Sequence, residues 1–561
     1  MRSRGAWRSK AFLIWAVGAQ MLPTSWLRRP ADSEWQAASE RYAALSREAR
    51  EVPITDGKRT NEYLKRLFLV FPGPVRGSDA IGYLGPEIEG PALTAVEVVG
   101  LPATPYLIRA CRDAKARTRE LALRTIVRIG DDSAVPALVE ALKDPEPAVR
   151  RAAAYGLGMF RATEALPALL SARLDPDAEV RDTVALALCL MRVRRVIRPL
   201  TELLRDSQRR VREQAARSLG MLGCPEAVPY LIPLLDDRQG WVRYDAMIAL
   251  RTLTYGIVTA RHGVPRLETA LREPFPDLAR AYRQFWRTHR RRSAGEWLRE
   301  SVELRIGMLG LPMTTQEYRE IVPPLEQMTF QRLYVPDERG EMILATDKWQ
   351  RWWAENRSRP EWEWVLRSES PVLQPGDSSP WAIVVKEGGL KAIPVAAELA
   401  ESNWWHAQRA VEVTKHLTMI DFGFATPGWT PETIPIAAEA ARKWYAQHGK
   451  DWDVRTQVRR ALGTARGNDF WIAARTLRWL GDWSAWPQML EKLESKYPSE
   501  RGTAARELEA LTARQIGRQV RASTSDLRMR NYAANWRLWL ERNAERMRKR
   551  EPALPMRRVR W

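Results

Sequence analysis

The stretch that decides the fold is residues 134–159, which read AVPALVEALKDPEPAVRRAAAYGLGM. Leu138 and Leu142 recur at helical spacing behind Pro136, and the first turn of a helix tolerates a proline because its N–H has no intrahelical partner there. The segment Asp144–Pro147 ends this helix, since proline cannot continue it and restrains the residue before it. A second helix is predicted directly after that segment. The stretch therefore predicts two short helices joined by a proline turn.

The same arrangement recurs every 31 residues between about residues 101 and 255. Each copy has an aspartate in the turn and an arginine six residues later: Asp113 with Arg119, Asp144 with Arg150, Asp175 with Arg181, Asp206 with Arg212, and Asp237 with Arg243. The first helix always carries a leucine and the second an apolar residue: Leu107, Leu138, Leu169, Leu200 and Leu231, then Ile126, Leu157, Leu188, Leu219 and Leu250. Two short helices cannot bury their apolar faces alone, so neighbouring pairs must stack. We expect an all-α fold, an elongated and curved α-solenoid.

This pattern resembles the HEAT repeat, in the short bacterial form first noted in phycobilisome lyases and grouped with the armadillo-like helical proteins. The resemblance implies that the recurring aspartate caps the second helix or pairs with an arginine of its own or a neighbouring repeat. The ten aspartates and arginines would then form a polar ladder that serves the lattice. A ligand-binding role is the alternative, but a catalytic site needs one unique constellation rather than identical groups at identical phase.

Beyond Tyr255 the 31-residue phase is lost and another signature appears four times. A helix end of Leu-Thr type is followed, 23 to 31 positions later, by an aromatic pair or its equivalent, with His or Asn four residues after the first member. The helix ends are Leu253-Thr254, Met328-Thr329, Leu417-Thr418 and Leu511-Thr512; the pairs are Phe285-Trp286, Trp352-Trp353, Trp444-Tyr445 and Trp539-Leu540; the polar residues are His289, Asn356, His448 and Asn543. We interpret the aromatics as core that extends the solenoid. The alternative is stacking on bases or sugars.

Composition excludes several classes of protein. The chain has 561 residues, 45% of them hydrophobic and 28% charged, which is typical of packed cores rather than of disordered or collagen-like chains. The apolar run at residues 11–22 is too short for a comfortable membrane span, which excludes a multi-pass membrane protein. Three cysteines and five histidines, without a Cys-x-x-Cys or His-Glu-x-x-His spacing, argue against a disulfide scaffold and a metal site.

The basic excess is concentrated at the two ends of the chain. The net charge is +21; residues 1–30 carry six basic and no acidic residues, and residues 514–561 carry fourteen basic and four acidic residues. A nucleic-acid-binding domain normally carries its charge along a folded face. Arg2, Arg4, Arg8 and Lys10 precede the apolar run, which is the layout of a secretory signal. We expect export or anchoring on the periplasmic side; an ordinary first helix of a cytoplasmic protein, or a start at Met21, is the alternative.

No catalytic constellation emerges from the sequence. Ile420-Asp421-Phe422-Gly423 imitates a protein-kinase landmark, but no His-Arg-Asp loop or Gly-rich loop precedes it. HEAT-type hydroxylases use His-Glu pairs as iron ligands, and no histidine here is followed by glutamate. The chain is expected to be no enzyme and to need no cofactor or metal.

The resulting hypothesis is a scaffold that presents a concave surface to a protein partner, with nucleic-acid binding as the alternative. Weak membrane association through residues 11–22 or the basic tail is a further expectation. The expected organisation is a signal peptide or anchor at 1–30, a helical cap at 31–100, five regular repeats at 101–258, divergent Trp-rich repeats at 259–545 and a basic tail at 546–561.

Overall fold

The computed structural model describes residues 44–548 apart from 46, 54, 69–95, 97, 266, 310, 312, 332, 337–341, 369–379, 403, 424–431 and 513–525. The expected signal segment at 1–30 and most of the basic tail lie outside the described residues.

Five helix pairs form the regular part of the chain, preceded by helix α2 (Gly57–Phe68). The pairs are α4 (Thr104–Ala110) with α5 (Ala116–Ile129), α6 (Val135–Ala141) with α7 (Pro147–Met159), α8 (Leu166–Ala172) with α9 (Ala178–Met191), α10 (Ile197–Leu203) with α11 (Arg209–Leu222), and α12 (Val228–Leu231) with α13 (Gly240–Leu253). Short 3-10 turns introduce the first helix of each pair, among them η3 (Leu101–Ala103) and η4 (Asp132–Ala134); η8 (Ile232–Asp236) continues α12. The prediction of an all-α solenoid of helix pairs is confirmed.

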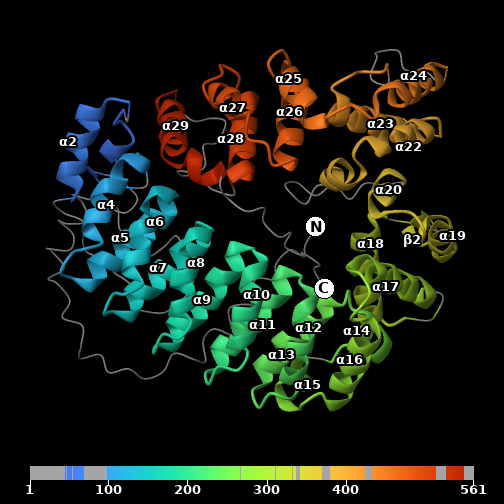
Figure 1. Ribbon diagram of the computed structural model, residues 1–561, viewed down its shortest axis with the longest axis horizontal. Helices are drawn as coiled ribbons and strands as arrows, with labels where there is room; N and C mark the ends of the chain where they lie inside the picture. The colour runs from blue at the N-terminus through green and yellow to red at the C-terminus, as the bar shows by residue number, and fades with distance from the viewer. Residues whose placement is uncertain are drawn as a thin grey trace, which may run out of the picture.

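The second half continues the stack with longer and less regular units (Figure 1). They are α14 (Ile257–His262), α15 (Leu267–Arg272), α16 (Pro276–His289), α17 (Ala294–Met308), α18 (Thr315–Thr329), α19 (Thr346–Asn356), α20 (Glu361–Leu366), α21 (Pro380–Ile383), the π turn η9 (Val384–Gly388), η10 (Gly389–Lys391), α22 (Ala392–Ala400), α23 (Trp404–Thr418), α24 (Thr433–His448), α25 (Val454–Leu462), α26 (Gly467–Trp479), α27 (Trp486–Lys492), α28 (Pro498–Thr512) and α29 (Asp526–Arg548). A small antiparallel hairpin, β1 (Tyr334–Pro336) with β2 (Met342–Leu344), pairs Val335 with Ile343 before α19.

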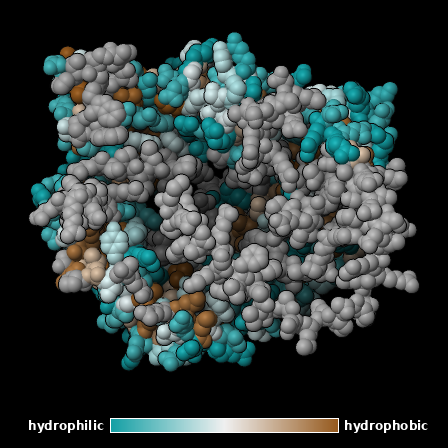
Figure 2. All heavy atoms as spheres, turned by 180° about the vertical axis from the view of Figure 1, so that it is seen from behind, coloured by the Kyte–Doolittle hydropathy of each residue, from teal (hydrophilic) through white to brown (hydrophobic). Residues whose placement is uncertain are grey.

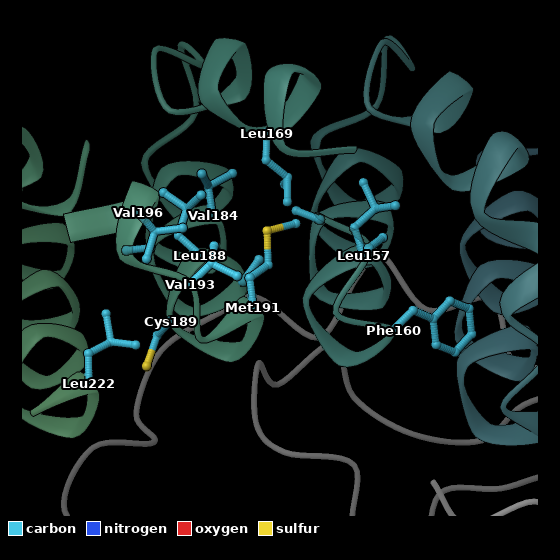
Figure 3. Packing of buried hydrophobic residues seen from close by; sticks show 14 of the residues in the cluster. Leu157, Phe160, Leu169, Val184, Leu188, Cys189, Met191, Val193, Val196 and Leu222 are labelled. Atoms are coloured by element: carbon cyan, nitrogen blue, oxygen red, sulfur yellow. The ribbon is translucent and has the colours of Figure 1, made fainter. Parts of the chain in front are cut away.

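Recurring apolar positions make one continuous core through the regular repeats. Leu157 and Leu188 are fully buried in it, as are the leucines of the first helices. Figure 3 shows Leu188 with Val184, Val193 and Val196 around it, between neighbouring helix pairs. The phase assigned from the sequence therefore places the core correctly.

Close approach of second helices explains two glycines that lie inside helices. A Cβ atom on Gly158 would stand 2.5 Å from Ala187 Cα, and one on Gly220 would stand 2.9 Å from Ala249 Cα. Gly158 lies within α7, one residue before that helix ends at Met159. Its small size lets α7 pack directly on the backbone of α9.

We expect Gly158→Ala to destabilise the fold by about 1–3 kcal/mol, because the added methyl group meets backbone rather than a movable side chain. Gly307 is the matched control, since it also lies in a helix but a Cβ there has nothing within 4 Å. Gly307→Ala should stabilise by roughly 0.5–1 kcal/mol, as alanine favours helix more than glycine. Urea unfolding followed by circular dichroism measures both, and equal effects would contradict the close packing.

The curvature of the stack brings its two ends into contact, so the elongated form expected from the sequence is replaced by a closed ring. Figure 1 shows α29 (red) beside α2 and the first repeats (blue). Asn535 receives a hydrogen bond from the Leu101 amide (2.8 Å) and donates one to the carbonyl of Val99 (3.2 Å). Arg542 Nη1 donates to the buried Asp131 carboxylate at 2.6 Å.

Two tryptophans of α29 complete this junction, which we call the seam. Trp536 and Trp539 have no solvent exposure, and their ring centroids are 5.8 Å apart. Trp539 Nε1 donates to the Gly130 carbonyl at 2.8 Å, and its ring lies 6.0 Å from that of Trp486 on α27. The same helix thus contacts the last units and the first repeats.

Candidate functional site

The recurring arginines and aspartates form a ladder across neighbouring repeats. Arg150 Nε and Nη2 donate to both carboxylate oxygens of Asp175, at 2.7 and 2.8 Å. Its Nη1 donates to the carbonyl of Asp144, the aspartate of its own repeat, at 2.9 Å. Asp175 Oδ1 also accepts the amide of Asp177 (2.9 Å). Each rung therefore joins two repeats and holds the turn between their helices.

Three more pairs repeat this geometry, at 2.7–2.9 Å: Arg119 with Asp144, Arg181 with Asp206, and Arg212 with Asp237. Asp113 and Arg243 stand at the two ends of the ladder. Asp113 accepts the Lys115 amide, and Arg243 donates to the carbonyl of Ala270 on α15 (3.1 Å). All ten residues singled out in the sequence thus serve contacts within and between repeats.

The electrostatics of the ladder favour the charged forms. Burial raises the pKa of Asp144, but hydrogen bonds from Arg119 and from the Glu146 amide outweigh it, and the pKa lies below its ordinary value. The hydrogen bond with Asp175 raises the pKa of Arg150. Asp144 and Arg150 are therefore held in their charged forms.

A further repeat of this type lies in the second half, where sequence reasoning missed it. Arg501 Nη1 donates to the carbonyl of Ser495 at 2.9 Å, as Arg150 does to that of Asp144. The signal is present in the sequence, because the spacing of Pro136, Leu138 and Arg150 recurs in Pro487, Met489 and Arg501. The repeat is hard to recognise because Ser495 stands where the other repeats have an aspartate.

The Leu-Thr signature marks equivalent helix ends. Thr254, Thr329 and Thr418 each donate from Oγ1 to the carbonyl four residues earlier, at 2.7–2.8 Å. The next residues, Tyr255, Phe330 and Met419, all adopt positive φ values, from 51° to 61°. These side chains end α13, α18 and α23 in the same way. The side chain of Thr512, the fourth copy, lies outside the described residues.

The aromatic signature is also one repeated structure, carried by α16, α19, α24 and α29. In all four copies the His or Asn bonds the carbonyl of the aromatic residue four positions earlier, at 2.7–3.0 Å: His289 to Phe285, Asn356 to Trp352, His448 to Trp444, and Asn543 to Trp539. Trp297 and Trp364 then donate from Nε1 to the carbonyls of His289 and Asn356. The polar residue is the last residue of α16, α19 and α24 and bonds a carbonyl of the final turn there, whereas Asn543 makes the same bond five residues before the end of α29.

Most of the aromatic rings of this signature are core. Three copies also have an aromatic residue three positions before the pair, and these residues, Tyr282, Trp349 and Trp536, have no solvent exposure. Phe285, Trp352 and Trp353 are 5–8% exposed, and the pair members Trp286 and Trp444 are half-buried. Edge-to-face contacts join Trp349 to Trp352 at 6.0 Å and Trp352 to Trp364 at 5.9 Å. The buried faces are not available for stacking on bases.

Two histidines are held neutral by burial. Burial lowers the pKa of His406 to about 4 and that of His416 to about 3. His416 bonds Thr476 Oγ1 through Nδ1 at 2.6 Å, and His406 bonds Ser402 Oγ at 2.7 Å. Among the described residues no group of three His, Cys, Asp or Glu side chains is placed to hold a metal ion.

One aspartate on the second helices is held in an unfavourable ionisation state. Burial raises the pKa of Asp182 to about 6; the positive charges of Arg210 and Arg217 oppose this rise, and the negative charges of Glu179 and Glu213 add to it. At neutral pH Asp182 is ionised, and its burial in the folded state makes that charged form unfavourable.

Asp182→Asn is expected to stabilise the protein by about 1–2 kcal/mol at pH 7, since a pKa unit corresponds to about 1.4 kcal/mol and partial exposure screens the shift. The folded pKa lies above the unfolded one, so the penalty is fully present above about pH 6 and fades as the pH falls toward 4. Unfolding curves of both proteins at pH 4, 6 and 8 measure it. Glu398→Gln, at a 67% exposed side chain, should stay within about 0.5 kcal/mol. A gain that grows as the pH falls would contradict the assignment.

A cavity of about 670 Å³ lies where η10, α24, α25 and the end of α26 meet. Its lining combines aromatic rings (Tyr445, Trp452), basic side chains (Lys391, Arg455, Arg459) and one acid, Asp453. The volume lies within the range of ligand pockets. No single sequence motif predicts this cavity, because four separate segments of the chain line it.

The basic side chains of this cavity differ in the hydrogen bonds and ion pairs that they already make. Arg459 Nε donates to Asp482 at 3.1 Å, and Arg455 Nη2 donates to the Leu480 carbonyl at 2.7 Å. Lys391 is exposed and has no ion-pair partner among the described residues. Asp453 caps α25 by accepting the Thr456 amide at 2.9 Å. The cavity thus offers positive charge beside flat aromatic surfaces.

Comparison with known proteins identifies the type of repeat in the regular half of the chain. The sequence profile of HEAT repeats matches residues 104–188 and 168–251. Curated proteins give no match. Within the described residues, no helix combines the length and apolar character that a membrane crossing requires.

Similar solved structures include the complex of CpcE and CpcF of phycocyanin lyase from Nostoc sp. PCC7120 (17% identity, TM-score 0.26, 45% of this chain and 99% of that one). They also include YibA of Escherichia coli (15% identity, TM-score 0.31, 54% of this chain and 99% of that one). A further one is karyopherin Kap121p bound to the extreme C-terminus of the protein phosphatase Cdc14p (12% identity, TM-score 0.32, 85% of this chain and 59% of that one). The stacked helix pairs, the ladder that joins them and the profile match lead to one conclusion: residues 104–251 of this chain are HEAT repeats.

Proposed function

We propose that this protein is a non-enzymatic scaffold whose concave surface binds a protein partner. HEAT and armadillo-like repeats commonly use the curved surface of the stack for such binding. The observation that supports the proposal most is the ladder, because its ten recurring polar residues are engaged with the lattice, as Arg150 and Asp175 illustrate. Recognition is left to side chains that differ from repeat to repeat.

The cavity beside Tyr445 and Trp452 is the anchoring point we assign to that partner. Lys391 and Arg455 suit an acidic side chain or a terminal carboxylate, and the rings suit the apolar part of the same segment.

A pull-down from the host cell with a cavity variant tests the proposal. Lys391→Glu with Arg455→Glu should lose a stoichiometric protein partner that the unaltered chain retains. The matched control, Arg194→Glu with Arg198→Glu, changes the same charge at side chains 72% and 91% exposed and should keep it. Equal recovery of every partner by both variants would overturn the assignment of the cavity, and absence of any stoichiometric partner would overturn the scaffold.

We do not extend the proposal to nucleic acid, because the buried tryptophans of the aromatic signature leave few faces for base stacking. Export or anchoring through residues 1–30 remains a proposal that rests on the sequence. Cell fractionation with a protease-accessibility assay tests it; recovery of the chain only from the cytoplasm, with its N-terminus intact, would contradict it.

A further inference from the structure

The ladder also defines an edge of the ring. Asp206 and Asp237 are successive rungs, so the residues that flank them lie side by side at this edge. Arg205 and Arg209 flank the first, and Arg238 follows the second. All three arginines are exposed, and none has an acidic partner within ion-pair distance among the described residues.

Helix α15 joins the same edge. A Cβ on Gly240 would stand 2.5 Å from Leu271 Cα, and Arg243 donates to the Ala270 carbonyl at 3.1 Å. These contacts place Leu271 and the exposed Arg272 next to Trp241, the residue that follows Gly240. We call Arg205, Arg209, Arg238, Trp241, Leu271 and Arg272 the rim patch.

Apolar side chains are exposed in this sector more densely than elsewhere. Trp241 is 41% exposed and Leu271 is 37% exposed, and Leu267, on the same face of α15, is 40% exposed. With Tyr230 they make four of the nine large hydrophobic residues exposed in the described part of the chain. Single exposed apolar residues are ordinary, but clusters mark interaction surfaces. Figure 2 shows one face of the molecule, on which hydrophobic side chains lie among hydrophilic ones.

Three aspartates near the patch have ion-pair partners. Asp206 and Asp237 are paired with Arg181 and Arg212 in the ladder. Asp236 lies 3.5 Å from Arg283 on α16. The four arginines of the rim patch outnumber the remaining carboxylates beside them, Glu213 near Arg209 and Glu268 and Glu273 near Arg272, and they lie beside exposed apolar side chains.

We propose that the rim patch binds the anionic surface of a lipid bilayer, with the arginines at the phosphate groups and Trp241 and Leu271 at the boundary of headgroups and acyl chains. Basic side chains near an anionic leaflet and a few apolar side chains together give reversible surface binding. Leucine adds nothing to contacts with a phosphodiester backbone, so this mixture favours lipid over nucleic acid. A rim formed by consecutive turns also suits a flat surface.

Co-sedimentation with vesicles tests the proposal on the full chain. Vesicles of phosphatidylcholine with phosphatidylglycerol should bind it, and vesicles of phosphatidylcholine alone should not. Arg209→Glu with Arg238→Glu should raise the lipid concentration for half-maximal binding at least about tenfold. Added salt should weaken the binding of the unaltered chain. Trp241→Ala should weaken it by a factor that salt does not change, since this contact is not ionic.

The basic ends of the chain also attract anionic lipid, so the decisive quantity is a difference between variants. Arg194→Glu with Arg198→Glu alters the charge equally at other exposed positions and should bind like the unaltered chain. Circular dichroism verifies that both variants are folded. Equal binding by the two variants would overturn the proposal. So would a pair that differs on duplex DNA but not on vesicles, which would make the patch a nucleic-acid surface.

Discussion

Trp539→Ala is expected to destabilise the protein by about 3–5 kcal/mol and to open the ring at the seam. Trp539 is fully buried between Trp486 and Trp536, so its removal leaves a cavity between the last units and the first repeats. It also leaves the Gly130 carbonyl without the indole N–H that it accepts at 2.8 Å. Both losses fall on the junction that joins the two ends.

The control is Trp539→Phe, which keeps most of the ring but loses the hydrogen bond. It should cost about 1–2 kcal/mol, the usual consequence of a buried acceptor left unpaired. Denaturant unfolding of the three proteins gives the comparison. If alanine and phenylalanine have the same small effect, the seam does not form in solution.

Leu188→Ala should cost about 2–5 kcal/mol, because Leu188 is fully buried in the middle of the regular repeats. Figure 3 shows it between α9 and the following pair, so the cavity affects the contact between repeats as well as the repeat itself. Neighbouring pairs depend on each other in a solenoid, and the loss should therefore lower the cooperativity of unfolding.

Leu174→Ala provides the matched control, since that leucine is 74% exposed in the turn of the same repeat. It should change the free energy of unfolding by less than about 0.5 kcal/mol. A cost near zero for Leu188→Ala would mean that the helical phase of the repeats is wrong.

The repeats were predictable from the sequence because their determinants are local. Pro136, Leu138 and Asp144 act within one helix pair, and the next pair repeats them at the same phase. The ladder was anticipated only as a choice between capping and pairing. The structure shows the arginine of one repeat binding the aspartate of the next, as Arg181 binds Asp206 at 2.7 Å.

Closure of the ring was not predictable, because it depends on a sum of small rotations between successive units. Asn535 and Arg542 contact the backbone of Leu101, more than 400 residues away in the sequence. Neither residue has a feature that distinguishes it from other polar residues of a surface helix. The cavity was not predictable from the sequence for a related reason, since its lining residues Lys391, Tyr445 and Arg455 come from separate segments.

The aromatic signature was predictable from the sequence only in part. Its spacing correctly predicted that Phe285, Trp352 and Trp539 pack into the core. The sequence assigned no role to its histidine and asparagine, yet in all four copies this side chain bonds the carbonyl four residues earlier in its own helix. A bond to the carbonyl four residues earlier is available to both side chains, which explains why His and Asn alternate at this position.

The most direct test of the closed ring is a distance between spin labels placed on its two ends. Lys58 at the start of α2 and Arg530 on α29 are both exposed, and Asn531 bonds the Val52 carbonyl nearby at 2.8 Å. Lys58→Cys with Arg530→Cys, in a chain with Cys111→Ser, carries the labels. The closed ring predicts a narrow distribution at about 20–30 Å, the ~10 Å spacing of adjacent helices widened by the label arms. An open rod of about a dozen helix pairs would separate the labels by roughly 100 Å, and that result would contradict the ring.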